Sequence, residues 1–228
     1  LAHTVLLFIR TLMVGTVPLT NLFEFGLVFV WGMVLFYLVI TYKYEMGLSG
    51  MFILPLAIIL MLWLFTLDMT VKPLMPALRS KWLLVHVITA VISYGCFAVS
   101  FAFSVMYLLK ERLVGKNSKS RFGDALPAFA LLDDLSYKAI FVGLPFLTIM
   151  LVTGAVWAEY SWGRYWNWDP KETWALVTWL VYAAYLHIRF LRGWKGKRCA
   201  YLSILGFLAV LFTFIGVSFL LPGIHSYL

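Results

Sequence analysis

The chain has 228 residues, of which 63% are hydrophobic and only 12% charged, and its mean hydropathy is +0.93. Water-soluble domains carry about 25% charged residues and are roughly half apolar, so this composition excludes a soluble fold. At about 20 apolar residues for each crossing, we predict an all-α, polytopic integral membrane protein, with residues 1–228 forming a single transmembrane domain.

The predicted elements follow the apolar runs in chain order. Residues 1–9 read as the tail of a truncated N-terminal helix, because the chain starts inside an apolar stretch. Six full spans are predicted after it, at 22–42, 51–67, 82–109, 139–158, 173–191 and 200–221. The second of these is short but long enough to cross, and the third projects beyond the bilayer on one side.

The charges of the connecting segments fix the expected orientation. When the segments alternate between two sides, 12 of the 18 Lys and Arg fall on one side, while the ten acidic residues divide equally. The positive-inside rule makes the basic side cytoplasmic, so 10–21, 68–81, 159–172 and 222–228 face outward. The net charge of +8 is therefore a topology signal and no evidence for nucleic-acid binding.

Several common kinds of site have no support in the sequence. The two cysteines, Cys96 and Cys199, are not part of a C-x-x-C pair, which leaves a disulfide scaffold, a zinc site and a dithiol redox site unsupported. A phosphate-binding P-loop and a pair of free carboxylates are also missing from the sequence.

A tryptophan-rich segment lies in the third outward loop, at 159–173. Five of the ten Trp occur within 18 residues, at Trp157, Trp162, Trp166, Trp168 and Trp174. An interfacial aromatic belt would spread its Trp over many helix ends. Because Trp supplies flat stacking area at little entropic cost, we predict a flat aromatic platform for a large planar hydrophobic ligand.

Part of this segment has a structural interpretation. Asp169, Pro170 and Glu172 occupy the N-cap, first and third positions of a helix start. We therefore interpret the two carboxylates as caps rather than as acid/base catalysts. Asn21, between Pro18 and Glu24, repeats the arrangement before the first full span.

Two histidines flank the tryptophan-rich loop on the same side of the membrane. His86 lies four residues after Trp82, about 6 Å below the outer end of its helix. His225 follows Pro222 and Gly223, past the outer end of the last span. Their common side indicates a shared ligand, and imidazole is a strong ligand for heme iron.

His187 lies 13 residues beyond Trp174, about 20 Å along the helix and in the cytoplasmic half. Ionisable groups at membrane depth are functional candidates, and Ala183 and Ala184 leave room beside it for a flat ring. The alternative is close helix packing through small residues, with a histidine near the basic helix end. His3, in the truncated first segment, is assigned no role.

The stretch from Trp162 to Trp174 reads Trp-Gly-Arg-Tyr-Trp-Asn-Trp-Asp-Pro-Lys-Glu-Thr-Trp. With His86 before it and His187 and His225 after it, it resembles the tryptophan-rich (WWD) motif of heme-handling membrane proteins in cytochrome c maturation. It looks most like the CcsA or ResC family, a subunit of the system II cytochrome c synthetase. The resemblance covers nearly the whole chain.

This resemblance implies that heme b (iron protoporphyrin IX) enters from the cytoplasmic side and is held outside. His86 and His225 would be its axial ligands there. His187 would belong to an inner site, completed by a histidine of a CcsB or ResB partner subunit. The outer heme would lie against Trp162, Tyr165, Trp166, Trp168, Asp169 and Trp174.

The implied activity is that of a cytochrome c heme lyase or synthetase component that needs the partner subunit. Its substrate would be an apocytochrome c with a C-x-x-C-H motif. Alternatives are a system I protein that delivers heme without ligation, a diheme electron-transfer protein that oxidises quinols, and a transporter without metal. The expected location is a bacterial plasma membrane or a thylakoid membrane, with membrane lipid around the spans.

Overall fold

The computed structural model describes residues 1–15, 17–19, 21–44, 47–70, 78–115, 121–221 and 223. Within these residues it contains helices and no strand, which confirms the all-α prediction. The helices are α1 (Ala2–Val14), α2 (Leu22–Tyr44), η1 (Gly47–Ser49), α3 (Gly50–Leu64), α4 (Lys81–Val114), α5 (Arg121–Ala125), α6 (Phe129–Trp162), α7 (Pro170–Arg192), α8 (Lys197–Leu211), η3 (Phe212–Gly216) and α9 (Val217–Leu220). The segment η3 is a π-helix, so α8, η3 and α9 form one continuous helical rod.

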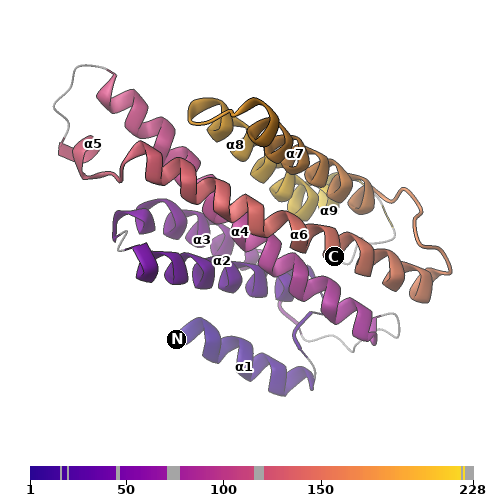
Figure 1. Ribbon diagram of the computed structural model, residues 1–228. Coiled ribbons are helices and arrows are strands. Elements are labelled where there is room, and N and C mark those ends of the chain that lie inside the picture. Colours follow the sequence, from indigo (N-terminus) through magenta and orange to yellow (C-terminus); the bar gives the residue numbers. More distant parts are fainter. Residues whose placement is uncertain are drawn as a thin grey trace.

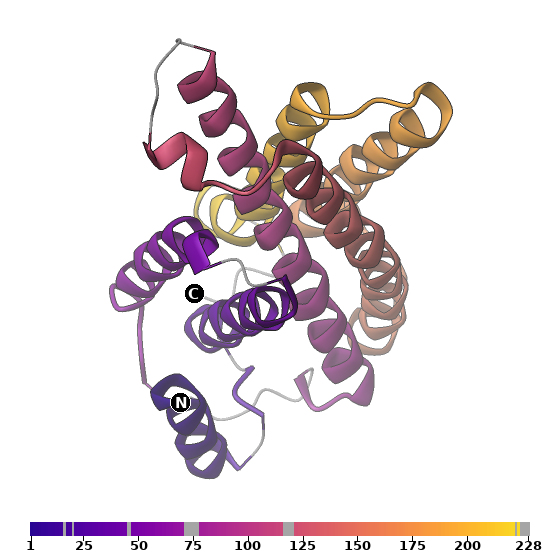
Figure 2. The same ribbon diagram turned by 60° about the vertical axis from the view of Figure 1, so that its left-hand side comes forward.

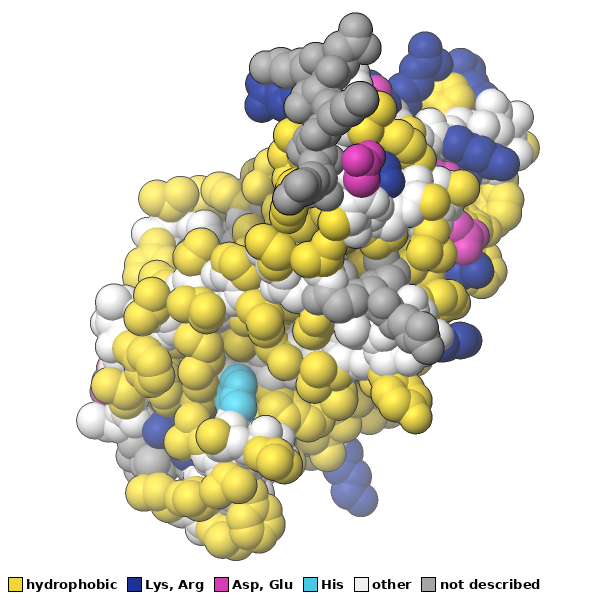
Figure 3. Space-filling model, turned by 90° about the vertical axis from the view of Figure 1, so that its left-hand side faces the viewer, with side chains coloured by type: hydrophobic (Ala, Val, Ile, Leu, Met, Phe, Trp, Pro, Cys, Tyr) yellow, Lys and Arg dark blue, Asp and Glu magenta, His cyan; other side chains and the backbone are white. Residues whose placement is uncertain are grey.

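Five helices in the described part of the chain are long and apolar enough to cross a membrane. They are α2, α4, α6, α7 and the rod at Lys197–Leu220. Their outward surfaces are apolar: Leu38, Ile59, Leu62 and Val152 are each more than half exposed. Figure 3 shows one such face, with hydrophobic side chains over most of it and Lys and Arg gathered mainly in its upper part. The protein is therefore a helical membrane protein.

The prediction of six full spans is not confirmed. The helix α3 has 15 residues and is about 22 Å long, which is shorter than the roughly 30 Å hydrocarbon core of a bilayer. It ends at Leu64, and just beyond that end the hydroxyl of Thr66 donates to the carbonyl oxygen of Trp63 over 2.7 Å.

The long helix α4 is the centre of the bundle and packs along α6 for much of its length. The helices α2 and α3 lie on one side of it, and α7 and α8 lie on the other (Figures 1 and 2). Close approach of α4 and α6 depends on Gly143, where an added Cβ would lie 2.7 Å from the ring of Phe97. Small residues have this function in many membrane bundles.

Buried hydroxyl groups join three of the spanning helices. The hydroxyl of Ser100 on α4 lies 2.8 Å from that of Ser136 on α6 and 2.8 Å from that of Ser203 on α8. Ser104 lies 3.0 Å from Ser136. Interhelical hydrogen bonds of this kind stabilise packing where apolar burial alone gives no advantage over lipid.

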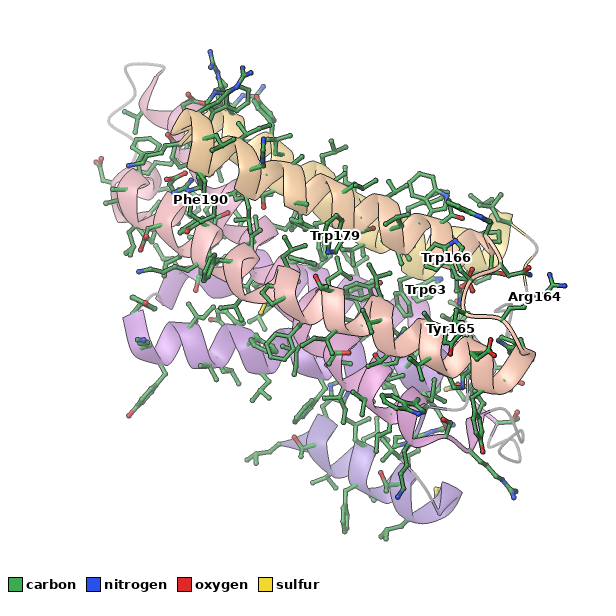
Figure 4. The ribbon with its side chains drawn as sticks, turned by 45° about the vertical axis from the view of Figure 1, so that its right-hand side comes forward. Trp63, Arg164, Tyr165, Trp166, Trp179 and Phe190 are labelled. Carbon is green, nitrogen blue, oxygen red and sulfur yellow. The ribbon has the colours of Figure 1, made fainter. Side chains whose placement is uncertain are left out.

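Hydrogen bonds join the helices α6 and α7 at one end and in the middle. At the end that is predicted to be cytoplasmic, Arg189 donates two hydrogen bonds to Asp133, at 3.0 and 2.8 Å. Midway, the indole N–H of Trp179 donates to the hydroxyl of Thr148 over 2.8 Å. Figure 4 shows Trp179 between Phe190 at one end of α7 and Trp166 at the other. This fastening sets where the tryptophan-rich loop lies.

Candidate functional site

The start of α7 is a capping box, as the sequence predicts. The Oδ1 atom of Asp169 accepts a hydrogen bond from the backbone N–H of Lys171 at 2.9 Å. The Oε2 atom of Glu172 accepts from the backbone N–H groups of Asp169 at 3.2 Å and Asn167 at 2.9 Å. Pro170 is the first helical residue. The two carboxylates therefore hold the loop against the helix, and the prediction that they are caps is confirmed.

The tryptophan-rich loop is shorter than the predicted 159–173, because α6 continues to Trp162; α7 begins at Pro170, where the capping motif predicts a helix start. Gly163 ends α6 with a φ of 72°, a left-handed conformation that glycine adopts without steric cost. Trp168 has a φ of 55°, which is unusual for a bulky residue. The capping box holds Trp168 in this conformation, where its side chain is 70% exposed.

The five Trp rings do not form one flat platform, so that prediction is wrong. Trp166 and Trp168 lie edge to face, with their ring planes at 88°. Trp157 and Trp162 are also edge to face, at 72°. Perpendicular pairs satisfy the ring quadrupoles better than a coplanar array.

Two of the Trp rings belong to helix packing. Trp157 is only 3% exposed and stacks on the imidazole of His86, with ring centroids 6.3 Å apart. Trp174 packs against Phe212 at a centroid distance of 4.3 Å. The loop therefore offers Trp162, Trp166 and Trp168, together with Tyr165, as the aromatic residues on its own surface. Figure 4 shows Tyr165 and Trp166 at the loop end of the bundle, with Arg164 pointing away from it.

A cavity of about 210 Å³ lies beneath this loop. It is formed where the starts of α2, α4 and α7 meet the ends of α6 and the last rod. Its polar lining residues are Asn21, His86, Tyr94, Tyr165, Trp166, Lys171, Glu172 and Thr213. Its apolar lining includes Phe25, Leu83, Val87, Met150 and Trp157. Residues from segments predicted to share the outer side of the membrane thus surround one hollow.

His86 is held in this cavity by the backbone of α6. Its Nδ1 atom lies 2.8 Å from the carbonyl oxygen of Met150. A carbonyl oxygen only accepts, so Nδ1 carries the proton and the Nε2 atom of the neutral ring has the lone pair. Metal-binding histidines commonly have this arrangement, in which the second ring nitrogen donates to a backbone carbonyl.

Sequence reasoning did not find the residues that hold His86. Gly154 lies beside the imidazole, and an added Cβ there would be 2.7 Å from Nδ1. Met150 and Gly154 are separated from His86 by more than 60 positions, so no local pattern connects them to it.

Lys171 and Asn21 also line the cavity. The sequence indicated only a motif position for Lys171 and a helix cap for Asn21. That cap is confirmed: the side chain of Asn21 accepts from Glu24 N at 2.9 Å.

The other histidines occupy different places. His187 is exposed on α7 and does not line the cavity. It is 17 positions after Pro170, about 25 Å along the helix. His225 lies outside the described residues. Gly223 is described and lies against the N-cap of α7, where an added Cβ would be 2.5 Å from Asp169 Oδ2.

Together, these features define a polytopic membrane protein with an imidazole-containing cavity beneath a tryptophan-rich loop. Residues 19–225 match the model of the family described as Cytochrome C assembly protein. The chain belongs to this family, and its role is in cytochrome c maturation.

Individual relatives agree with this assignment. The chain is 39% identical to the cytochrome c biogenesis protein CcsA of Guillardia theta, over 98% of this chain and 81% of that protein. It is 38% identical to the protein of the same name from Porphyra purpurea, over 93% of this chain and 79% of the relative. For the Chlamydomonas reinhardtii protein of that name, the identity is 38% over 97% of this chain and 64% of the relative.

Proposed function

We propose that this protein carries heme across the membrane and presents it at the outer face for covalent attachment to apocytochrome c. It would act as the CcsA-type component of a cytochrome c synthetase. One observation carries this proposal: the hydrogen bond from His86 to Met150 fixes the imidazole in the cavity as the tautomer with its lone pair on Nε2. Imidazole nitrogen is a common axial ligand of heme iron.

The chemistry of the cavity lining suits one face or edge of a porphyrin, since a volume of about 210 Å³ is smaller than a whole heme. Phe25, Leu83 and Val87 provide apolar surface, which favours burial of a large hydrophobic ring. Tyr165 and Trp166 come from the loop, and aromatic rings stack favourably on flat π-systems. Among the described residues, the lining thus combines one imidazole with a largely apolar surface, which supports binding of a porphyrin through its iron.

His225 is the second axial ligand in this proposal. Its support is that Gly223, two positions earlier in the sequence, lies against Asp169. Gly223 therefore lies beside the same capping residue that holds the tryptophan-rich loop.

His187 belongs to an inner heme site that a partner subunit of the CcsB or ResB type completes. Its imidazole is exposed on a membrane-spanning helix, and ionisable groups facing lipid are costly. The neighbouring Ala184 is also exposed and permits close approach of another helix. A partner that covers this face would remove the imidazole from lipid.

The reaction is the addition of two cysteine thiols of the apocytochrome to the two vinyl groups of heme. In each addition a sulfur–carbon bond forms on one vinyl carbon, the thiol proton is transferred to the other, and the carbon–carbon double bond becomes single. The protein contributes by holding the porphyrin where the thiols approach, since positioning alone supplies a large part of such rate gains. The membrane would be the bacterial plasma membrane or the thylakoid membrane.

The test is co-expression with the partner subunit and an apocytochrome c in a host without its own maturation system, scored by covalently bound heme. We expect a covalent product with the native chain, a large loss with His86→Ala, and no loss with Val85→Ala. Val85 is 41% exposed and does not line the cavity. A purified protein that binds heme yet gives no covalent product with the partner would indicate delivery without ligation. A protein without a Soret band would refute heme handling altogether.

A further inference from the structure

Two residues that line the cavity each carry a buried hydrogen-bond donor with no partner within the part of the chain that the structure describes. The donors are the side-chain amide nitrogen of Asn21, Nδ2, and the indole nitrogen of Trp166, Nε1. Both residues line the cavity beneath the tryptophan-rich loop. Leaving a buried donor unsatisfied is destabilising, and such groups in native proteins call for an explanation.

A third donor in the same cavity is the ammonium group of Lys171. The residue is half-buried and lines the cavity, and none of the ion pairs among the described residues involves it. Its backbone N–H donates to Asp169, and the carboxylate of Asp169 is the charge that acts on its ammonium group. Lys171 also lies in the first turn of α7, where the helix dipole favours an anion.

These three groups share one chemical property, because each of them donates hydrogen bonds and none accepts through the atom concerned. A lysine that only reaches toward the membrane surface would not account for two further buried donors in the same hollow. A ligand that satisfies all three must bring acceptor oxygens, and a negative charge pairs with the ammonium group.

We propose that Lys171, Trp166 and Asn21 form a carboxylate-binding subsite of this cavity. Resting on the proposed function, the carboxylate is a propionate of heme. A porphyrin held by axial imidazole alone can turn about the bond between iron and nitrogen. A propionate held at Lys171 removes that freedom, so the subsite determines which edge of the porphyrin is presented for attachment.

The test compares heme with heme dimethyl ester, in which both propionates are esterified and uncharged. The full-length protein is purified in detergent and titrated with each porphyrin. Lys171→Met removes the charge and keeps the side-chain length, while Lys171→Arg keeps the charge. Trp166→Phe removes the indole N–H. Asn21→Asp retains the oxygen that caps α2 and replaces the amide donor by an anion.

We expect the native protein to bind heme about 10-fold or more tightly than the dimethyl ester, since a hydrogen bond to a charged group contributes about 1.5–3 kcal/mol. Lys171→Met should abolish this preference by weakening heme binding alone, and Lys171→Arg should retain most of it. Asn21→Asp should weaken heme more than the ester. Retained binding of the ester shows that each variant is folded.

Two results would overturn the subsite. One is equal affinity of the native protein for the two porphyrins, which would assign the donors to another carboxylate, such as that of a lipid. The other is a loss in Lys171→Met that is the same for both porphyrins. If the native protein binds neither porphyrin, the proposed function itself fails, and the subsite fails with it.

Discussion

His86 on α4 is bound to the backbone of α6, because its Nδ1 atom donates a hydrogen bond to the carbonyl oxygen of Met150 over 2.8 Å. Gly154, one turn further along α6, gives the imidazole the space that it occupies. The orientation of the His86 imidazole, which is the proposed iron ligand, is therefore determined by Met150 and Gly154. Neither residue contributes a side-chain functional group to this contact.

The first prediction concerns Gly154→Ala. The new Cβ would lie 2.7 Å from Nδ1 and 2.8 Å from Cε1 of His86, so the ring must move and its bond to Met150 must weaken. We expect heme affinity to fall about 10- to 100-fold, as is typical when a group that orients a metal ligand is lost. Heme titration of the purified protein measures this change.

The matched control for Gly154→Ala is Val152→Ala. Val152 lies on the same helix, is 59% exposed and does not line the cavity. Its replacement should leave heme affinity unchanged. If Gly154→Ala binds heme as tightly as the native protein, the backbone of α6 does not position His86 for binding.

The second prediction concerns the capping box. Glu172→Ala removes the acceptor of two backbone N–H groups, those of Asn167 and Asp169, whereas Glu172→Gln retains an acceptor oxygen. A lost cap costs about 1 kcal/mol, which corresponds to roughly 2–4 °C in melting temperature for a chain of this size. Thermal unfolding in detergent should show this loss for the Ala variant only.

Heme binding should follow the same order, because the box also holds Trp168 in its left-handed conformation. The Gln variant should bind heme like the native protein, and the Ala variant more weakly. Equal weakening in both variants would show that the charge of Glu172, rather than its capping function, matters for the ligand.

The sequence could predict what depends on local patterns. Apolar runs located the five long spans, and the order Asp169, Pro170, Glu172 located the start of α7 to the residue. The place of His86 near a helix end also follows from counting residues along a helix. Each of these features is determined by neighbours in the chain, so the sequence displays it directly.

The remaining features depend on tertiary contacts. The pairing of His86 with Met150 and Gly154 joins α4 to α6, and neither partner stands out within its own helix. The orientations of the Trp rings are set by Phe212, His86 and one another, so the number of Trp residues alone suggested a flat surface that does not exist. The end of α3 at Leu64 falls inside an apolar run, so the sequence pattern does not mark it.

The third prediction concerns the pair of Asp133 and Arg189, which lies at the opposite end of α7 from the cavity. Both side chains are largely buried, with relative exposures of 13% and 10%, and Asp133 also accepts from Gly196 N at 2.8 Å. Breaking a buried pair by removing one partner costs about 3–5 kcal/mol. We expect Asp133→Ala to lower the free energy of unfolding by that order, measured by denaturant titration in mild detergent.

An exposed ion pair on the same helix provides the control for this change. Lys138 and Asp134 are one turn apart on α6 and both are about half exposed. Lys138→Ala should leave the free energy of unfolding nearly unchanged, because solvent screens an exposed ion pair. Similar losses for Asp133→Ala and Lys138→Ala would mean that the buried pair contributes no more than a solvated one.

The fourth prediction separates the roles of His86 and His187. His86 on α4 lines the cavity, whereas His187 is exposed on α7 outside it. The two imidazoles therefore belong to different sites. His187→Ala should leave binding of added heme by the purified chain unchanged, since the cavity is intact. In cells with the partner subunit, the same variant should lose most of the covalent cytochrome product, because heme would no longer enter through the inner site. His86→Ala should reduce both measurements.

Leu180→Ala is the control on α7, because Leu180 is 53% exposed and has no titratable group. It should leave both measurements near those of the native chain. Effects of sites without shared partners add within about 0.5 kcal/mol. The variant with both His86→Ala and His187→Ala should therefore bind added heme with the same affinity as His86→Ala alone. A fall in that binding for His187→Ala as large as for His86→Ala would contradict two separate sites and would place both histidines on one heme.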